Sequence, residues 1–219
     1  MRGELYNLKP VFLITAGPTR EYLDPVRFFS NPSTGKMGYA LARAARDRGA
    51  KVILVSGPVA LCAPGGVRLV RVESANEMRR EVLRWRRRAD VIIMAAAVAD
   101  YRPAKRLSRK MKKGSRQINV PMVRTADILA ELGRKKGNRI LVGFAAETAS
   151  LVREAKRKLR EKNLDMIVAN DVSRRDEGFA SDYNRGIIIN RAGNITRLPR
   201  MRKAALARII VQRCLSLLA

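Results

Sequence analysis

The sequence predicts a doubly wound α/β fold, in which helices cover both faces of a mostly parallel β-sheet. Short, β-branched apolar runs recur along the 219 residues, as in VFLIT from residue 11 and KVILVS from residue 51. Runs of this kind are typical of strands that are buried on both faces. Segments with the apolar spacing of helices separate them, and such strand–helix alternation favours a parallel, Rossmann-like sheet.

The first half of the chain contains most of this alternation. In the first expected helix, Met37 and Leu41 fall on one apolar stripe and Gly49 is a C-terminal stop. Ser74 and Glu77 form a capping box at the start of the second. The expected elements are, in order, a strand from residue 11, a helix over 35–50, strands over 51–56 and 67–72, a helix from Ser74 and a strand from Asp90 to about Asp100.

The second half begins with a basic stretch that has no consistent apolar period, and we expect it to form a flexible flap over about 102–116. A short Gly-containing turn between GIIIN and NITRLP predicts a β-hairpin arm over about 178–198. We expect one domain over 1–219. The remaining elements are a helix over 126–137, a strand over 139–147, a helix over 150–163, a strand over 164–171 and a closing helix from about Met201.

Charge is the most unusual feature of the composition. The chain has 46 Lys and Arg against 19 Asp and Glu, and the resulting net charge of +27 attracts polyanions whatever the fold. The basic residues are spread over nearly every expected helix, and 5% of residues are aromatic, which leaves few surfaces for stacking bases. We interpret the charge chiefly as a solvated surface with incidental polyanion binding, and a basic nucleic-acid-binding module stays an alternative.

The sequence contains no histidine, which excludes Ser-His-Asp and Cys-His catalysis and every His-ligated metal site. Cys62 and Cys214 lack C-x-x-C spacing, so we expect idle or buried thiols. No apolar run is long enough to cross a bilayer and no secretory signal is visible, which predicts a cytoplasmic protein without a membrane partner. Any chemistry must use Lys, Arg, Asn, Asp, backbone amides or a carboxylate-bound metal.

Unusual residues follow several of the expected strands, in the segments AGPTRE, AAAVADYR and GFAAET. Ligands of open parallel sheets bind where strands end at their carboxyl edge, so this edge is the candidate site. Taken singly, each Ala-rich end could serve close helix packing alone. The loop SNPSTGKMG is neither a Walker A motif nor a G-x-G-x-x-G fingerprint, but it enters a helix start that is receptive to anions, with Asn31 beside it.

Clustered lysines suggest where phosphates could bind. In RKMKK, Arg109, Lys110, Lys112 and Lys113 repel one another, which fits either a phosphate-clamping flap or a solvated loop. Lys158 and Lys162 share a helix face, where Glu154 and Glu161 can partly offset their repulsion. A triphosphate between this face and the flap would remove the conflict.

Several long motifs together resemble the phosphopantothenoylcysteine synthetase family. They are AGPTREYLDPVRFFSNPSTGKMG, AAAVADYR, KMKK, GFAAET, KNLDMIVANDV and GFASDYN, in the family's order from about Ile14 to Asn184. The resemblance implies a ligase that forms a carbon–nitrogen bond in coenzyme A biosynthesis. With Mg²⁺, it would activate the carboxylate of 4′-phosphopantothenate with CTP, ATP being the alternative nucleotide, and release pyrophosphate. It would then couple the acyl-cytidylate to L-cysteine and release CMP.

The resemblance also implies partners. Family members are commonly homodimers with sites near the interface, so either the 185–198 hairpin or the Arg27 loop is expected to pack against a second copy. In bacteria the unit is often half of a bifunctional protein, which implies a separate or fused flavin-dependent decarboxylase.

The site residues implied by the resemblance fall into three sets, for catalysis, substrate and nucleotide, and the metal ligands stay open. Catalytic roles would belong to Asn31 and Lys110, and substrate contacts to Asn31, Arg27, Gly35 and Ala96. Ala126 departs from the family, which commonly has proline in a TPDIL-like segment, so the first turn of the helix is less rigid here. The nucleotide residues would be Met94, Ala95, Ala96, Asp100, Lys110, Ala126, Asp127, Ile128, Leu129, Phe144, Lys158 and Lys162.

An NAD(P)-dependent reductase of similar topology is the alternative enzyme. It is disfavoured because no glycine fingerprint follows the first strand. Ser56 and Gly57 also stand where an acidic residue would bind the ribose at the end of the second strand.

Overall fold

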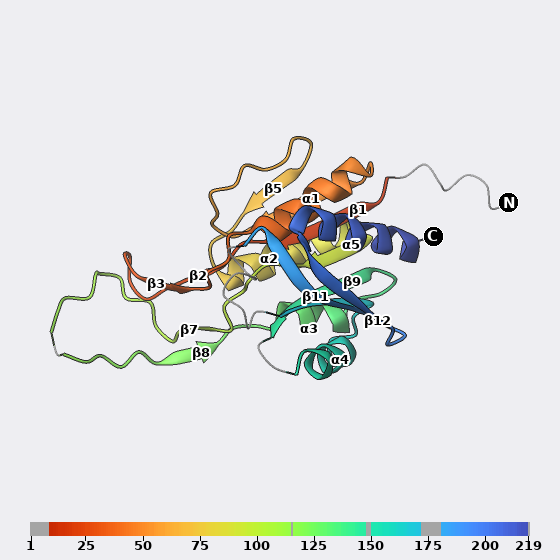
Figure 1. Cartoon of the computed structure of the whole chain (residues 1–219). Helices are drawn as coiled ribbons and strands as arrows, with labels where there is room; N and C mark the ends of the chain where they lie inside the picture. The colour runs from red at the N-terminus through yellow and green to blue at the C-terminus, as the bar shows by residue number, and fades with distance from the viewer. Residues whose placement is uncertain (1–8, 115, 148–149, 172–180, 219) are drawn as a thin grey trace.

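The structure, a computed structural model, describes residues 9–114, 116–147, 150–171 and 181–218. Its main sheet confirms the predicted doubly wound, mostly parallel fold (Figure 1). Counted from one edge, the first six strands run parallel to one another. The last two pairings, of the sixth strand with the seventh and of the seventh with the eighth, are antiparallel. In spatial order they are β5 (Arg68–Arg71), β4 (Lys51–Ser56), β1 (Val11–Ala16), β6 (Val91–Met94), β9 (Ile140–Glu147), β10 (Met166–Asp171), β11 (Tyr183–Asn190) and β12 (Ile195–Arg202).

Helices cover both faces of this sheet, and each face buries its own apolar cluster. On one face α1 (Lys36–Asp47) packs beside α5 (Lys203–Leu218). The other face carries α2 (Ala75–Trp85), the short 3-10 helix η1 (Arg86–Arg88), α3 (Ile128–Arg134) and α4 (Leu151–Glu161). In the described part of the chain no helix has the length and apolar character needed to span a membrane.

The order of the strands places a topological switch point between β1 and β6. From β1 the chain proceeds to β4 and β5 on one side, and then crosses to β6 on the other. The loops that follow β1 and β6 therefore separate at the carboxyl edge of the sheet, and this is where ligands of open α/β sheets bind. The candidate edge predicted from the sequence thus contains the switch point.

A local interaction fixes the start of each of the first two helices. The capping box is confirmed, because Ser74 Oγ accepts from the Glu77 N–H at 3.2 Å and a Glu77 carboxylate oxygen accepts from the Glu73 N–H at 2.9 Å. In α1, Gly38 permits close approach to β1, since a Cβ there would lie 2.4 Å from the Ala16 Cβ. The first turn of α1 therefore lies directly against the carboxyl end of β1.

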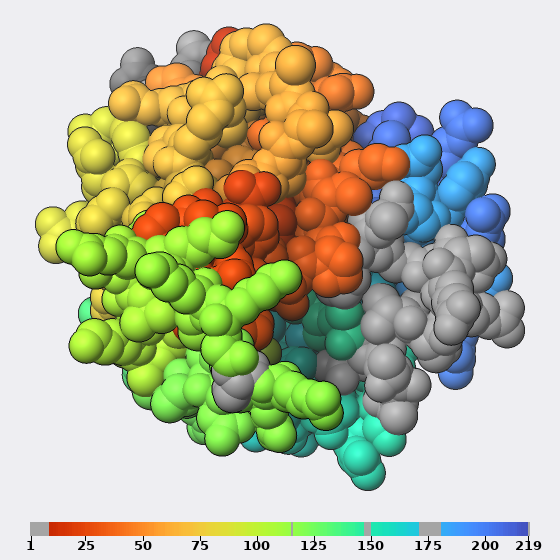
Figure 2. Space-filling model, turned by 90° about the vertical axis from the view of Figure 1, so that its left-hand side faces the viewer, coloured from red at the N-terminus to blue at the C-terminus, as the bar shows by residue number. Residues whose placement is uncertain are grey.

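Two pairs of short strands were missed by the sequence analysis. The β2–β3 arm consists of β2 (Arg20–Tyr22) and β3 (Phe28–Ser30), and it interrupts the connection from β1 to α1. The β7–β8 arm consists of β7 (Tyr101–Pro103) and β8 (Met122–Arg124), and the predicted flap over 102–116 falls largely in its loop. Both arms extend from the main sheet on the same side (Figure 1). They lie side by side on that face of the molecule (Figure 2).

Other boundaries differ from the predicted ones. The strand predicted to reach about Asp100 ends at Met94, and the helix predicted over 126–137 is the shorter α3. The predicted hairpin consists of β11 and β12, which extend the main sheet at its edge. The closing helix begins at Lys203. Ser115 of the predicted flap, Thr148 of GFAAET and residues 178–180 of the predicted hairpin arm lie outside the described residues.

Candidate functional site

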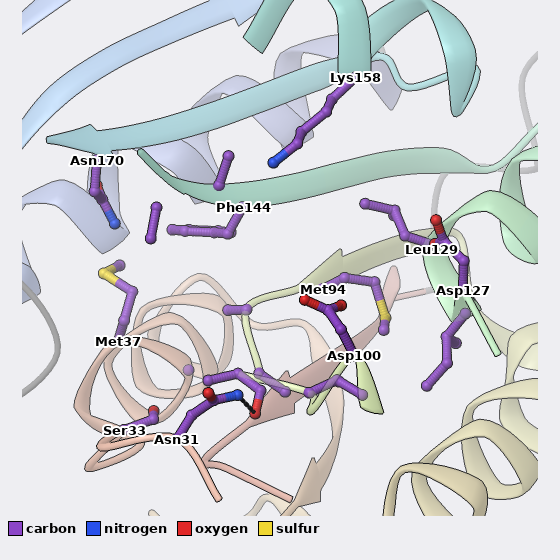
Figure 3. A pocket seen from close by; sticks show the side chains of 18 of the residues that line it. Asn31, Ser33, Met37, Met94, Asp100, Asp127, Leu129, Phe144, Lys158 and Asn170 are labelled. Carbon is purple, nitrogen blue, oxygen red and sulfur yellow. Dashed lines mark hydrogen bonds between the residues drawn. The ribbon is translucent and has the colours of Figure 1, made fainter. Parts of the chain in front are cut away.

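A cavity of about 670 Å³ lies at the carboxyl edge beside the switch point (Figure 3). Its wall combines the start of α1, the loop after β6, the start of α3, and residues of β9, α4, β10, β11 and α5. Most of the predicted site residues meet in this wall although they are far apart in the sequence. They are Asn31, Gly35, Met94, Ala95, Ala96, Asp100, Ala126, Asp127, Ile128, Leu129, Phe144, Lys158 and Lys162.

Buried threonines hold the loop that follows β6. Thr15 Oγ1 accepts from the Ala96 N–H at 3.1 Å, and Thr19 Oγ1 accepts from the Ala99 N–H at 3.0 Å. Both threonines are fully buried, so these bonds are shielded from water. They hold this loop beside β1 and the segment that follows it, beyond the end of β6. The small alanine side chains of this loop leave its backbone close to any ligand.

Asn31 is held with its amide in the cavity wall. It follows β3, and its Nδ2 donates to the Ala97 carbonyl at 3.1 Å (Figure 3). An asparagine amide has two N–H donors and a carbonyl acceptor, so this single bond orients the group without using all of its capacity. Ser30 Oγ donates to the Thr19 carbonyl at 2.8 Å and fixes the preceding residue. The β2–β3 arm, which the sequence analysis did not predict, therefore positions Asn31.

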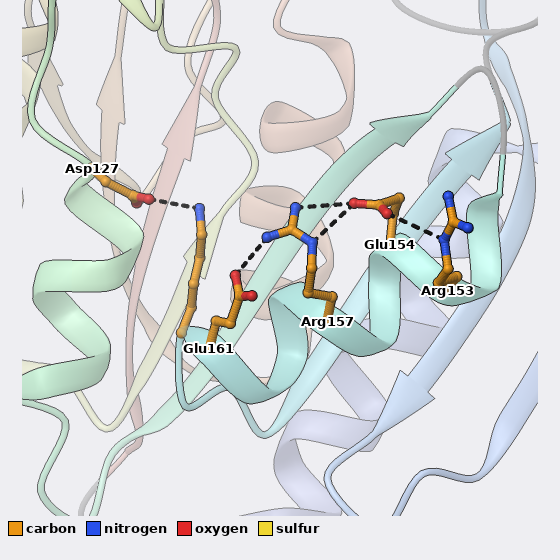
Figure 4. Close-up of polar contacts among 6 residues, drawn as sticks. Asp127, Arg153, Glu154, Arg157 and Glu161 are labelled. Carbon is orange, nitrogen blue, oxygen red and sulfur yellow. Dashed lines mark hydrogen bonds and ion pairs between the residues drawn. The ribbon is translucent and has the colours of Figure 1, made fainter.

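Cationic and anionic groups meet where α3 and α4 face the cavity. Asp127 caps α3 by accepting from the Ala130 N–H at 2.9 Å, and Lys162 Nζ lies 2.9 Å from the Asp127 carboxylate (Figure 4). Burial tends to raise the pKa of Asp127, but the bonds from Ala130 and Lys162 outweigh it and lower the pKa below its usual value. The Lys158 amine points toward the cavity in Figure 3.

The glutamates of α4 have a partner that we did not predict. Glu154 and Glu161 both bind Arg157, at 3.0 and 2.6 Å (Figure 4). For Lys162 the compensating carboxylate is Asp127, on another element. Helical spacing could identify which residues share a face, but it could not reveal a partner that the fold brings from α3.

Two of the predicted residues, Arg27 and Lys110, are not in the cavity wall. They stand on the two arms, which are joined by the fully buried Asp24. Its carboxylate accepts from the N–H groups of Val26 and Arg27, each at 2.8 Å, and from that of Met111 at 3.1 Å. The Arg27 guanidinium also binds Asp24 at 2.7 Å and the Met111 carbonyl at 3.1 Å. The Arg27 guanidinium is thereby held beside Met111, which follows Lys110 in the chain.

The Asp24 carboxylate is strongly favoured in its ionised form. Burial tends to raise its pKa, but the backbone bonds from Val26, Met111 and Arg27, with the positive charge of Arg27, lower the pKa to about 2. The carboxylate therefore stays charged and keeps the arms together at neutral pH.

Some residues of the cavity wall were not found by sequence reasoning. Lys36 is in the quoted SNPSTGKMG segment but received no role, whereas Lys203 begins α5 and stands outside every quoted motif. The signal that reveals Lys203 is burial of a charged side chain, since it is 6% exposed. Asn184 is also buried in this wall.

Metal binding by protein groups alone is not supported by the described residues, in which no three His, Cys, Asp or Glu side chains come together. The cavity wall does contain carboxylates, and Asp100 points toward its interior in Figure 3. Mg²⁺ usually keeps several waters and binds through one or two carboxylates and the phosphates of a substrate. The wall fits that mode of binding. Cys214 is buried, as expected, and burial raises the pKa of its thiol to about 12.

Comparisons with known proteins agree with this architecture. The "Coenzyme A biosynthesis bifunctional protein CoaBC" of Bacillus subtilis (strain 168) is 51% identical over 201 residues, which are 91% of this chain and 50% of that protein. The protein of the same name from Vibrio vulnificus (strain YJ016) is 46% identical over 222 residues, 98% of this chain and 55% of that protein. The chain thus spans about half the length of these curated relatives.

Structural similarity covers nearly the whole chain. The crystal structure of the C-terminal domain of coenzyme A biosynthesis bifunctional protein CoaBC matches with a TM-score of 0.83 and 44% identity, over 96% of this chain and 97% of that one. Residues 9–218 match the family described as "DNA/pantothenate metabolism flavoprotein C-terminal domain". The resemblance recognised in the sequence motifs is confirmed, and the chain belongs to this family.

Proposed function

We propose that this chain is a phosphopantothenate–cysteine ligase, which activates the carboxylate of 4′-phosphopantothenate with CTP and couples it to cysteine. The observation that carries the proposal is that Asn31, Asp100 and Phe144 meet with Lys158 and Lys162 around one cavity at the switch point. This chain spans about half the length of relatives that are named for coenzyme A biosynthesis. Their names support the same class of reaction.

The first step, transfer of the nucleotidyl group, requires little from the protein beyond positioning and charge neutralisation. The attacking carboxylate is already ionised, so no general base is needed, and the absence of histidine is no obstacle. Lys158 and Lys162 lie where they can neutralise the phosphates of a nucleotide. Mg²⁺, when bound, would add to that neutralisation, held mainly by the phosphates with Asp100 as its candidate protein ligand.

In the second step the cysteine amine attacks the acyl carbon and CMP leaves. Negative charge develops on the carbonyl oxygen during this attack, and a positioned N–H donor stabilises it. Asn31 fits this role because its amide is oriented by Ala97 and retains a second N–H. We therefore assign Asn31 to amide formation and not to nucleotidyl transfer.

We also propose that the chain acts as a homodimer through its two arms. Their exposed surface is unusually apolar, with Val26 58% and Phe29 43% exposed, and Phe28, Tyr101, Ile118, Met122 and Val123 also exposed. Such a patch is typical of an interface. Of the two expected contact regions, these exposures favour the Arg27 loop over the 185–198 hairpin. A second copy seated there would surround Arg27 and Lys110. A mass measurement in solution that found a monomer at micromolar concentration would reject this.

A flavin-dependent decarboxylase remains the expected separate or fused partner, because this chain corresponds to about half of its bifunctional relatives. The reductase alternative is disfavoured by the fold itself. The β2–β3 arm occupies the connection between β1 and α1, where a dinucleotide would need a tight glycine turn.

One assay tests the proposed reaction. The protein is incubated with 4′-phosphopantothenate, Mg²⁺ and either CTP or ATP, with and without cysteine, and pyrophosphate and nucleoside monophosphate are followed separately. We expect pyrophosphate with CTP, and nucleoside monophosphate in quantity after cysteine is added. Absence of pyrophosphate with both nucleotides would reject the ligase.

A further inference from the structure

Asp127 uses its two carboxylate oxygens for two different contacts. Oδ1 caps α3 by accepting from the Ala130 N–H at 2.9 Å. Oδ2 lies 2.9 Å from Nζ of Lys162, the residue that ends α4 (Figure 4). Both Asp127 and Lys162 line the cavity. One carboxylate therefore joins the start of α3 to the end of α4, at the part of the wall where the nucleotide phosphates are proposed to bind.

The glutamates of α4 do not fix the amine of Lys162, because they are bound elsewhere. Glu154 and Glu161 both bind Arg157, at 3.0 and 2.6 Å. Lys158 stands four residues before Lys162 on the same helix face, so the two amines repel each other. A lysine side chain is long and flexible, and ordering it costs conformational entropy. The described contact that holds the Lys162 amine at the cavity wall is thus the one with Asp127.

This ion pair is too exposed to contribute much to folding. The Asp127 side chain is 52% exposed and that of Lys162 is 23% exposed, and ion pairs in contact with solvent add little to stability. Burial tends to raise the pKa of Asp127, but the bonds from Ala130 and Lys162 outweigh it, so the pKa lies below its usual value and the carboxylate is charged at neutral pH. The significance of the pair therefore lies in where it holds the amine.

We propose that Asp127 is a positioning residue, whose carboxylate holds the Lys162 amine in place for the phosphates of the nucleotide. This inference rests on the proposed ligase function. The resemblance counts Asp127 among the nucleotide contacts, but a carboxylate repels a phosphate directly, whereas an amine attracts it. A cation that is already in position requires no reorganisation when the phosphates arrive. Asp127 thus acts on the nucleotide through Lys162.

The variant Asp127→Asn separates the two contacts. Asparagine caps a helix as well as aspartate does, so the bond from Ala130 is kept, whereas the second oxygen becomes an NH₂ group that cannot accept from a lysine. Because part of a charge-assisted bond is lost, we expect CTP to bind roughly five- to twenty-fold more weakly. The measurements are calorimetry with CTP alone and the KM of CTP in pyrophosphate release. The KM values of 4′-phosphopantothenate and cysteine, and the thermal midpoint, should stay unchanged.

The direction of this change distinguishes positioning from a simple effect of charge. If Asp127 were only a negative charge near the phosphates, its removal would strengthen CTP binding, because a repulsion would disappear. If it were only the cap of α3, Asp127→Asn would leave CTP binding unchanged. Either result would overturn the proposal. Asp127→Ser also keeps a capping oxygen and removes the charge, and it replaces Asp127→Asn if that variant fails to fold.

A double-mutant cycle tests whether Asp127 acts through Lys162. Lys162→Gln alone should weaken CTP binding, and adding Asp127→Asn to it should have no further effect, since the residue to be positioned is gone. Independent losses that multiply would show that Asp127 contacts the nucleotide directly, against the proposal.

The matched control is Asp47→Asn, which removes an exposed carboxylate that binds Arg46 at 2.7 Å in the last turn of α1 and should change no KM. Wild-type protein that binds CTP but releases no pyrophosphate would reject the proposed ligase function, and the calorimetric comparison of the variants would still test the positioning of Lys162.

Discussion

The cavity and the two arms are built in opposite ways. The cavity lies on the carboxyl edge of a fully packed sheet, where buried threonines fix the loop after β6 and Gly38 fits against β1. The arms project from that sheet as pairs of three-residue strands with exposed apolar side chains, and Asp24 ties them together. The wall of the cavity is thus held within one chain, whereas the arms expose the apolar side chains on which the proposed contact with a second copy rests.

The largest expected effect tests whether the cavity region is packed more tightly than the arms. Gly38→Ala would place a Cβ 2.8 Å from the Thr15 carbonyl oxygen, so we expect a loss of about 1–3 kcal/mol in the free energy of unfolding. Gly114→Ala in the loop of the β7–β8 arm meets nothing within 4 Å and should change it by less than about 0.5 kcal/mol. Urea denaturation of both variants measures this. Equal losses would show that the arm is packed as tightly as the cavity.

Asn31→Ala tests the chemistry of the cavity. We expect amide formation to slow by roughly a hundredfold, corresponding to about 3 kcal/mol of lost stabilisation of the developing oxyanion, while pyrophosphate release persists and the acyl-cytidylate accumulates. The measurement is a single-turnover assay that separates the two steps, with the exposed Asn138→Ala as control. If pyrophosphate release stopped as well, Asn31 would belong to the first step.

Lys110→Gln tests whether the arms contribute to the reaction. Removal of a point charge from a phosphate clamp should slow nucleotidyl transfer by roughly tenfold with no change in thermal stability. Lys113→Gln, in the same exposed loop, is the control and should change the rate less. Rates that equal those of the wild type would remove Lys110 from the catalytic residues, and the cavity would act without the loop of the β7–β8 arm.

Asp24 gives the arms a predicted sensitivity to acid. Its pKa in the folded protein, about 2, lies below its usual value of 3.8. The stabilisation is therefore complete above about pH 4 and is lost as the pH falls toward 2. Pepsin cleavage within 104–121 should accelerate over that range in the wild type, and Asp24→Asn should be cleaved rapidly throughout. A cleavage rate of Asp24→Asn equal to that of the wild type at pH 4 would refute the clamp.

How much the sequence could predict differs between the same two regions. Long apolar runs and helical stripes identified the main sheet and its carboxyl edge, because periodicity is clear in elements that are packed on a core. The strands of the arms, such as Phe28–Ser30, are too short to show a period and have an exposed surface. These strands could not be predicted. Because they position Asn31 and keep Lys110 away from the cavity wall, those two features could not be predicted either.

Residues of the cavity wall were predicted where a motif carried them and were missed where the fold alone brought them in. Phe144 and Asp127 stand in quoted segments, whereas Lys203 reaches the cavity because α5 packs on α1 after the chain has completed the sheet. Burial of a lysine cannot be deduced from the local sequence. The same limit explains why Asp127, and not a glutamate of α4, balances Lys162.

The most direct measurement is a crystal structure of the protein with CTP, Mg²⁺ and 4′-phosphopantothenate in the absence of cysteine. The account predicts the nucleotide phosphates beside Lys158 and Lys162 and the reacting acyl group next to Asn31, all within the cavity at the switch point. A nucleotide bound outside this cavity, with Asn31 remote from the acyl group, would contradict it.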